Sequence, residues 1–250
     1  MVIPHHRRRD LLAASLSAVA GQQVIVVDDS PRGGVVAPGA RVVRGAGGEG
    51  FARAVNRGLD AAQAHGASHA LLLNDDAAPA PGCVAALVAA WAPGVGAAGP
   101  VLMQPDGSVE SAGIDVRWWG RVRARPRAPG AITEVDGLSG ACLLIDARER
   151  LDVSFAHGME DLDLCLRLRR RGLRCLLVPS ARCDHHGGGS LDRASPEAQR
   201  HAVSGQLRLM GGGARSAPVL ALAAAQVARE GGGSVRWRSI LDGWSDWRRR

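Results

Sequence analysis

The sequence predicts an α/β protein with a mostly parallel central sheet flanked by helices, followed by a helical C-terminal extension. Aliphatic runs at residues 24–27 and 71–73 have the length and composition of buried parallel strands. These runs alternate with segments of helical periodicity, which favours a parallel sheet covered on both faces. Beyond Gly187 the chain is helical in pattern, with glycine interruptions, to its end.

The first part of the chain supplies the alternating elements. We expect strands at 2–4, 24–27, 41–44 and 69–73, and helices at 10–19 and 50–65. Asp10 lies near the N-cap of the first helix, and Gly66 ends the second. Residues 79–82 are then predicted to form a turn, 83–91 a helix, and 95–103 a region that contains a short strand.

Residues 104–133 interrupt this regularity. Pro, Gly and Arg recur there around Trp118 and Trp119, which indicates a flexible connection or a small antiparallel excursion. Regular patterns return at 135–145, with a helix at 160–171 and a strand at 175–178 that ends at Pro179. We therefore expect a main domain over 1–190, in halves 1–103 and 104–190, and a helical extension over 191–250.

Composition limits the classes of partner. The formal net charge is +7 over 250 residues, and all 31 basic residues are arginine, which favours contact with anions such as phosphates. The arginines are dispersed and not interleaved with aromatics, so we expect no nucleic-acid partner. The five cysteines form no C-x-x-C pair, which argues against a disulfide framework and indicates a reduced, cytoplasmic setting.

Acidic residues close two of the predicted strands. Asp28 and Asp29 follow one strand, and Asn74, Asp75 and Asp76 follow another. Ligands of open α/β sheets bind beyond the carboxyl ends of the strands, and neighbouring carboxylates are tolerated where a cation offsets them. These pairs therefore predict a site for a metal and a nucleotide, although each is also typical of a capped turn.

A third acidic group begins the helix predicted at 160–171. A carboxylate from Glu160 or Asp161 at a helix start beside a cleft can serve as a general base. The alternative is that acids in the first turn and arginines in the last turn only complement the helix dipole.

Two further motifs carry competing interpretations. His185 follows Cys183 and Asp184, but no second ligand pair has zinc spacing, so we expect His185 to meet a diphosphate or a shared metal. Residues 45–50 match G-x-G-x-x-G, with Asp75 at the spacing of a ribose-binding acid. That match predicts an NAD(P)-dependent oxidoreductase, an alternative that leaves the first strand and the Glu160 helix unexplained.

Taken together in chain order, these segments resemble an inverting family-2 glycosyltransferase of the GT-A fold, in its rhamnosyltransferase-like branch. The matching segments are Val2-Ile3-Pro4, Val26-Val27-Asp28-Asp29-Ser30, Gly50-Phe51 with Asn56 and Gly58, Leu72-Leu73-Asn74-Asp75-Asp76, Gly140 to Ile145, Glu160-Asp161-Leu162-Asp163, and His185 with Gly187, Gly188 and Ser190.

The resemblance implies transfer of a sugar from a nucleotide diphosphate sugar, such as dTDP-rhamnose, to an acceptor hydroxyl with inversion, in cell-surface glycan synthesis. Asp161 would be the catalytic base, and Asp76 with His185 would bind a divalent Mn or Mg ion. Substrate-binding residues would be Pro4, His5, Asp28, Asp29, Arg53, Asn56, Asn74, Asp75, Gly140 and Glu160. Residues 1–103 would hold the nucleotide sugar, and 104–190 the acceptor, a glycan or lipid-linked molecule.

The C-terminal residues suggest a membrane contact. Trp237, Ile240, Leu241, Trp244 and Trp247 fall at helical spacing among arginines, a pattern suited to an anionic bilayer surface at the inner face of the cell membrane. Packing of this helix on the protein's own core is the alternative. A non-catalytic nucleotide-sugar-binding protein would keep the same sheet without needing Asp161.

Overall fold

The computed structural model describes residues 1–117, 121–155, 158–187, 195–211, 216–229 and 234–248. Several residues singled out by the sequence lie outside these ranges, namely Trp118, Trp119, Gly188, Ser190, Arg249 and Arg250. The strands are β1 (Val2–His5), β2 (Ile25–Asp28), β3 (Arg41–Arg44), β4 (His69–Leu73), β5 (Ala77–Pro79), β6 (Val95–Met103), β7 (Val109–Ser111), β8 (Ile114–Val116), β9 (Val122–Ala124), β10 (Thr133–Glu134), β11 (Cys142–Asp146) and β12 (Arg174–His185). The helices are α1 (Arg9–Ala18), α2 (Phe51–Ala64), α3 (Cys83–Ala89), α4 (Glu160–Arg170), α5 (Pro196–Leu209), α6 (Ser216–Arg229) and α7 (Ser234–Arg248).

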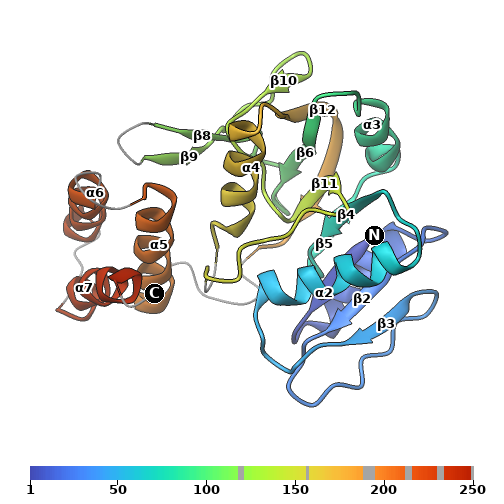
Figure 1. Ribbon diagram of the computed structural model, residues 1–250, viewed down its shortest axis with the longest axis horizontal. Coiled ribbons are helices and arrows are strands. Elements are labelled where there is room, and N and C mark those ends of the chain that lie inside the picture. The colour runs from blue at the N-terminus through green and yellow to red at the C-terminus, as the bar shows by residue number, and fades with distance from the viewer. Residues whose placement is uncertain (118–120, 156–157, 188–194, 212–215, 230–233, 249–250) are drawn as a thin grey trace.

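The main sheet has the strand order β10-β12-β6-β11-β4-β1-β2-β3. β1 pairs in parallel with β2 and β4, and β2 pairs in parallel with β3. β11 lies antiparallel between β4 and β6, whereas β6 and β12 are again parallel. The predicted α/β fold, with a central sheet flanked by helices, is confirmed (Figure 1).

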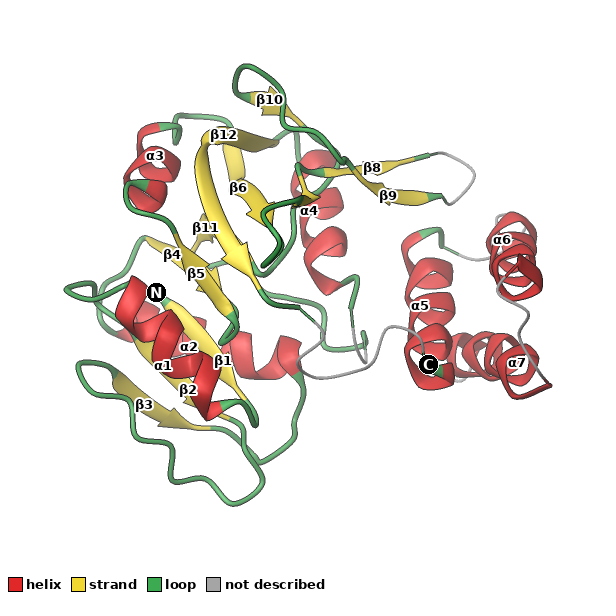
Figure 2. Cartoon of the chain, turned by 180° about the vertical axis from the view of Figure 1, so that it is seen from behind, coloured by secondary structure: helices red, strands yellow, loops and turns green. Residues whose placement is uncertain are grey.

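Alternating strand residues build a core on each face of the sheet. Val2 and Leu72 belong to the cluster under α2 and α4, whereas Ile3 and Leu73 belong to the cluster under α1 and α3. Successive side chains of a strand point to opposite faces, so continuous aliphatic runs serve both layers. Figure 2 shows α1 in front of the first strands and α4 beside the second half of the sheet.

β12 is longer than the sequence predicted, because it continues past Pro179 to His185. Its pairing with β6 shifts in register between Val178 and Arg182, so Pro179 lies in an irregular segment. Proline lacks the N–H that a ladder needs, and a bulge tolerates that loss. Beyond the bulge, β12 pairs with β5 and places His185 opposite Ala77.

Residues 104–133 form the antiparallel alternative of the two that the sequence left open. β7 pairs with β6, and β8 with β9 makes a separate two-stranded sheet. Ile114 also bridges to Gly137, which ties the hairpin to the main body. Figures 1 and 2 both show the hairpin projecting from the sheet toward α5 and α6.

The C-terminal helices pack against α4 and the β8–β9 hairpin through a third apolar cluster. Leu162 of α4 lies in this cluster with Val203 and Leu207 of α5, and Trp244 and Trp247 of α7 pack against it. The division into a domain at 1–190 and an extension at 191–250 stays a prediction. No helix in the described part of the chain is long and apolar enough to cross a bilayer.

Candidate active site

The carboxyl ends of the parallel strands bring the predicted acidic residues to one edge of the sheet. His5 at the end of β1 lies opposite Asp28 at the end of β2. β4 lies on the other side of β1, and its last residue is followed directly by Asn74. Pro4, opposite Val27, precedes this edge within β1.

Asp28 organises the turn that follows β2. Its Oδ1 accepts hydrogen bonds from the Ser30 backbone N–H (3.1 Å) and hydroxyl (2.5 Å), and its Oδ2 accepts from the Val35 N–H (3.1 Å). Burial opposes ionisation of Asp28, but these hydrogen bonds outweigh it and lower the pKa of the carboxyl. Arg44 lies nearby, with Nη1 3.6 Å from Oδ1. The geometry gives Asp28 a structural role in the loop.

Asp29 fills the glycine-rich loop with its own carboxylate. Oδ1 accepts N–H groups from Gly47 (2.9 Å), Gly48 (2.8 Å) and Glu49 (3.1 Å), and Oδ2 accepts from Gly50 (3.2 Å). Successive backbone N–H groups before a helix form an anion-binding nest. The donors that a dinucleotide pyrophosphate would need are therefore engaged by Asp29, which disfavours the oxidoreductase interpretation.

His5 and Asp75 form a buried pair beside α1. His5 Nδ1 lies 2.7 Å from Asp75 Oδ2, and the His5 side chain is 1% exposed. Ser15 of α1 donates to the Asp75 carbonyl oxygen at 3.0 Å. His5 Nε2 is buried without a hydrogen-bond partner among the described residues.

His185 lies between the carboxylates of Asp76 and Glu110. Its Nε2 lies 3.2 Å from Asp76 Oδ1, and its Nδ1 lies 2.7 Å from Glu110 Oε2. The Asn74 amide nitrogen is 3.4 Å from the same Nε2. Burial opposes protonation of His185, but Asp76 and Glu110 outweigh it and raise the pKa to about 9. Burial likewise opposes ionisation of Asp76, yet the hydrogen bond and the charge of His185, with smaller contributions, together outweigh it and lower the pKa of Asp76.

The donor set around His185 fits a hard divalent cation. Asp76 supplies a carboxylate, and His185 an imidazole nitrogen once a bound cation displaces the proton of Nε2. Asn74 Oδ1 is a buried oxygen without a partner among the described residues. Within the same described ranges, no three His, Cys, Asp or Glu side chains are arranged to hold a metal alone. A cation here would depend on phosphate oxygens of a bound substrate to complete its coordination.

Glu110 was missed by the sequence reasoning. It lies on the short strand β7, inside the region where no period was visible. Histidines that bind metals usually donate their other N–H to a carboxylate, which fixes the tautomer, and Glu110 stands in that position. No sequence signal pointed to Glu110 beyond its being an acid between Asp106 and Asp115.

The backbone of Gly140 holds the Asp161 carboxylate. The Gly140 N–H donates to Asp161 Oδ2 at 2.7 Å, and the Leu162 N–H donates to Oδ1 at 2.8 Å. A Cβ at Gly140 would lie 3.2 Å from the Asp161 Cβ and 3.5 Å from Phe51, which explains the need for glycine. Each carboxylate oxygen keeps a further lone pair, so Asp161 can still accept a proton.

Glu160 and Asp161 are adjacent acids with different environments. Glu160 is 6% exposed, and its Oε2 has no hydrogen-bond partner in the described part of the chain. Burial, followed by the charge of Asp161, raises the pKa of Glu160 to about 8. Burial also raises the pKa of Asp161, but the Gly140 and Leu162 N–H groups oppose that rise. Near pH 7, Asp161 is therefore the acid of this pair that ionises first.

Met159, which precedes this pair, has a strained backbone. Its φ of 75° lies in the left-handed region, where non-glycine residues are uncommon. Gly205 of α5 packs against it closely, since a Cβ at Gly205 would lie 3.0 Å from Met159 Cγ. The C-terminal helices thus support the chain where it enters α4.

Asn56 and Arg53 occupy different environments on α2. The Asn56 amide donates to the Leu151 carbonyl oxygen and accepts from the Leu151 N–H, both at 2.9 Å. Its side chain therefore clamps the loop before α4 through one donor and one acceptor. Arg53 is exposed and forms no ion pair with any described residue.

Hydrogen bonds connect the two groups of acids. Asp161 binds the Gly140 N–H, and the carbonyl oxygen of the next residue, Ala141, accepts the Asn74 N–H at 2.9 Å. Asn74 in turn lies beside His185 and two residues before Asp76. The base candidate and the metal candidate therefore belong to one contiguous site.

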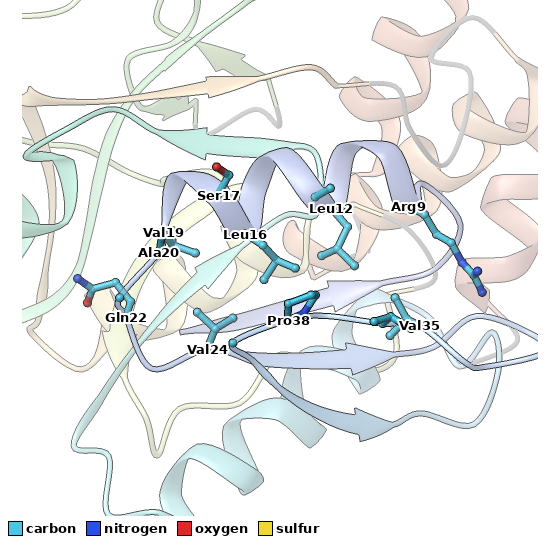
Figure 3. A pocket seen from close by; sticks show the side chains of 14 residues that line it. Arg9, Leu12, Leu16, Ser17, Val19, Ala20, Gln22, Val24, Val35 and Pro38 are labelled. Carbon is cyan, nitrogen blue, oxygen red and sulfur yellow. The ribbon is translucent and has the colours of Figure 1, made fainter.

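A hollow of about 500 Å³ lies elsewhere, between α1 and residues 35–39 (Figure 3). Leu12, Leu16, Val35 and Pro38 line it, and none of its lining residues belongs to the acidic edge described above. It therefore adds nothing to the chemistry of the site.

Comparisons with known proteins address the family. A family model described as "Glycosyl transferase family 2" matches residues 1–146. N-acetylglucosaminyl-diphospho-decaprenol L-rhamnosyltransferase of Mycobacterium tuberculosis, from strains CDC 1551 / Oshkosh and ATCC 25618 / H37Rv, is 28% identical over 228 residues. The alignment covers 75% of this chain and 74% of that relative.

Solved structures address the fold. GalNAc-T7 with UDP, GalNAc and Mn²⁺ superposes with a TM-score of 0.61 at 15% identity, over 84% of this chain. This chain spans about half, 47%, of the length of that structure. The mannosyltransferase PcManGT from Pyrobaculum calidifontis, with GDP-Man and Mn²⁺, gives a TM-score of 0.55 at 13% identity, over 98% of this chain and 85% of that one. The fold is the GT-A fold that the resemblance implied.

Proposed function

This chain belongs to glycosyl transferase family 2, and on that premise we propose that it moves a sugar from a nucleotide diphosphate donor to an acceptor hydroxyl with inversion. The observation that carries the proposal is the hydrogen bond from the Gly140 N–H to Asp161, because it fixes a carboxylate beside the Asn74–Asp76 edge. A base on one side and a leaving group on the other is the arrangement that an inverting displacement needs.

In the proposed reaction, the acceptor oxygen bonds to the anomeric carbon while the bond to the diphosphate breaks. Asp161 takes the proton of the acceptor hydroxyl, and the N–H groups of Gly140 and Leu162 keep its carboxylate oriented. Glu160, protonated near pH 7, can donate a hydrogen bond to a substrate oxygen. Arg53 supplies an exposed positive charge for the donor phosphates.

Asp76 and His185 are the residues that we propose hold a divalent ion, Mn or Mg. When bound, such an ion neutralises charge on the leaving diphosphate. Asn74 and the His5–Asp75 pair border the same edge and are proposed to contact the nucleotide, as are Pro4, Asp28 and Asp29 through the loops that they hold. Asn56 then acts by position, since its side chain is engaged with Leu151.

The donor and acceptor are proposed from the relatives. The mycobacterial relative is named for rhamnosyl transfer to a diphospho-decaprenol-linked N-acetylglucosamine. We propose a dTDP-rhamnose-like donor and a lipid-linked or glycan acceptor in cell-surface glycan synthesis. The solved neighbours were crystallised with nucleotides and Mn²⁺, which supports testing manganese first.

A panel of nucleotide sugars tests this proposal. We expect one donor to raise the thermal unfolding midpoint only when Mn²⁺ or Mg²⁺ is present. In Asp76→Asn, the metal should no longer increase the shift that this donor produces. Transfer to an acceptor must follow with the same donor. A metal-independent shift with NADH and none with any nucleotide sugar would support the oxidoreductase alternative, and donor binding without transfer would support a binding protein.

Some apolar residues of the C-terminal helix pack against the protein itself. Ile240 is buried, and Trp244 and Trp247 pack against the cluster shared with α4 and α5. Trp237 and Leu241, 43% and 63% exposed, remain on the outer side. We propose that the part of α7 in a peripheral contact is these two residues, and that Trp237→Ser with Leu241→Ser would weaken binding in a vesicle flotation assay.

A further inference from the structure

The β8–β9 hairpin has one apolar face and one arginine face. Val116 lies directly opposite Val122, and Ile114 opposite Ala124. Ile114, Val116 and Val122 pack against the cluster built by α4, α5 and α6. Because successive side chains point to opposite sides of a strand, the residues between them point away from that cluster.

The outward face carries several arginines and one acid. Asp115 lies opposite Arg123, and the Arg117 N–H donates to the Arg121 carbonyl oxygen at 2.8 Å, which places these two arginines opposite each other. Asp115 is already paired with Arg125, with an oxygen 2.7 Å from Nη2. The face therefore has an excess of positive charge.

Three of these guanidinium groups have no partner within the described ranges. Arg117, Arg121 and Arg123 are exposed, and none forms a side-chain hydrogen bond or ion pair with a described residue. Like charges directly opposite each other on paired strands destabilise a hairpin. Arg117 and Arg121 lie opposite each other with no acidic partner among the described residues, so this face of the hairpin is suited to bind an anionic surface outside the protein.

We propose that Arg117, Arg121 and Arg123 form a docking face for an anionic lipid bilayer. Clusters of basic residues on a projecting element bind anionic headgroups, each contributing to the attraction while it lies within a Debye length of the surface. The apolar face of the hairpin is already covered by the helical cluster, so the contact is electrostatic and not an insertion.

A bilayer fits this face better than a nucleic acid. Single-stranded nucleic acids are bound in charged grooves that follow several nucleotides, whereas β8 and β9 are three residues each. The face is also a short flat ribbon and not a groove that tracks a phosphate backbone. The inference goes beyond the transfer reaction, and its test needs no donor or acceptor.

Flotation of the full chain with phosphatidylcholine vesicles, with and without phosphatidylglycerol, tests the proposal. We expect the protein to float only with phosphatidylglycerol, and to be released at high salt. The triple variant Arg117→Gln, Arg121→Gln, Arg123→Gln should lose about 100-fold in its partition coefficient. Its thermal unfolding midpoint should not fall, because the like-charged pair is removed.

A charge-matched control separates the face from net charge. Arg32, Arg170 and Arg174 are exposed at other places, and the triple variant with Gln at these positions removes the same charge. We expect it to bind vesicles nearly as the unchanged chain does. The proposal would be overturned if both variants lost vesicle binding equally, or if the unchanged chain did not float with phosphatidylglycerol. It would also be overturned if the hairpin variant lost RNA binding but kept vesicle binding.

Discussion

Two acids that are neighbours in the sequence acquire different chemistry at the scale of single residues. Asp161 receives N–H groups from Gly140 and Leu162, whereas Glu160 is buried with an unpartnered oxygen. The sequence places both acids at a helix start, but it does not reveal the contact with Gly140, which lies just before β11 and 21 residues earlier in the chain. The local sequence pattern therefore identified Glu160 and Asp161 as candidates, and their tertiary contacts give the two acids different tendencies to ionise.

The Glu160→Gln variant should be more stable than the unchanged protein at neutral pH. The pKa of Glu160 rises from an ordinary 4.5 to about 8 in the folded state, so between these values only the folded protein retains the proton. Its contribution to stability is therefore present below pH 4.5 and lost as pH rises through 8. Glutamine should raise the free energy of unfolding by on the order of 1–3 kcal/mol at pH 8 and little at pH 5. Urea unfolding at pH 5 and pH 8 measures the free energy of unfolding of both proteins. An equal increase at the two pH values would refute the raised pKa of Glu160.

The Glu110→Leu variant should weaken binding of Mn²⁺ at His185. Without the carboxylate beside Nδ1, the imidazole loses the partner that fixes its tautomer, and loss of such a partner costs about 10–100-fold in metal affinity. Titration of Mn²⁺ by electron paramagnetic resonance measures the affinity, and ¹⁵N shifts of His185 report the tautomer directly. Glu110→Gln, which can still accept from Nδ1–H, should recover part of both signals. Unchanged affinity and unchanged shifts in Glu110→Leu would exclude this role.

Asp28 and Asp29 show what sequence reasoning can and cannot reach. Their position after a buried strand predicted the correct edge of the sheet. Their partners are backbone N–H groups of loops that have no regular period, and such pairings depend on the path of the chain. Whether they also touch a nucleotide stays a prediction.

At the scale of elements, the close approach of α2 to the sheet depends on a missing side chain. A Cβ at Gly58 would lie 2.3 Å from Val2 Cγ1 and 3.0 Å from Val27 Cγ2. Glycine inside a helix is otherwise unfavourable, so its presence here has a packing reason.

Gly58→Ala should therefore destabilise the protein in spite of alanine's better helix propensity. The methyl group would have to displace Val2 or the helix itself, at a cost of about 1–3 kcal/mol. Gly130→Ala is the matched control, because a Cβ there meets nothing within 4 Å. Denaturant midpoints of both variants measure the difference. A Gly58→Ala protein as stable as the control would show that the helix can shift without cost.

Most elements could be predicted because their periodicity is local. The strands Arg41–Arg44 and His69–Leu73 have the predicted bounds, and α2 and α4 differ from theirs only at the ends. β12 could not be predicted in full, because Pro179 reads as a terminator unless the bulge opposite β6 is known. The sequence left an antiparallel excursion open at 104–133, but it did not give the bounds of β8 and β9, since these strands are three residues each.

At the scale of the whole molecule, the site exists only where two halves of the chain meet. β11 is the antiparallel strand that joins the parallel group around β1 to β6 and β12, and Gly140 lies just before it. The Asn56–Leu151 clamp connects the helix after the glycine loop to the segment before α4. The C-terminal helices add a third contact through Met159.

Asn56→Ala should weaken this connection between the halves. It leaves the partly buried N–H and C=O of Leu151 without their partner, at a cost of about 1–3 kcal/mol. Asp60→Ala, one turn later on α2, removes only a surface ion pair with Arg150, worth about 0–1 kcal/mol. Thermal unfolding compares the two, and transfer rates should fall more in Asn56→Ala. Similar thermal unfolding midpoints for the two variants would show that the Asn56–Leu151 hydrogen bonds do not stabilise the protein.

The measurement that tests the central claim most directly is a comparison of donor binding with sugar transfer in Asp161→Asn. Asparagine keeps the shape of the side chain but cannot take the acceptor proton. We predict metal-dependent donor binding within about threefold of the unchanged protein, and a transfer rate reduced by about 100-fold or more. Transfer that persists near its original rate, at any pH between 6 and 9, would contradict the assignment of Asp161 as the base.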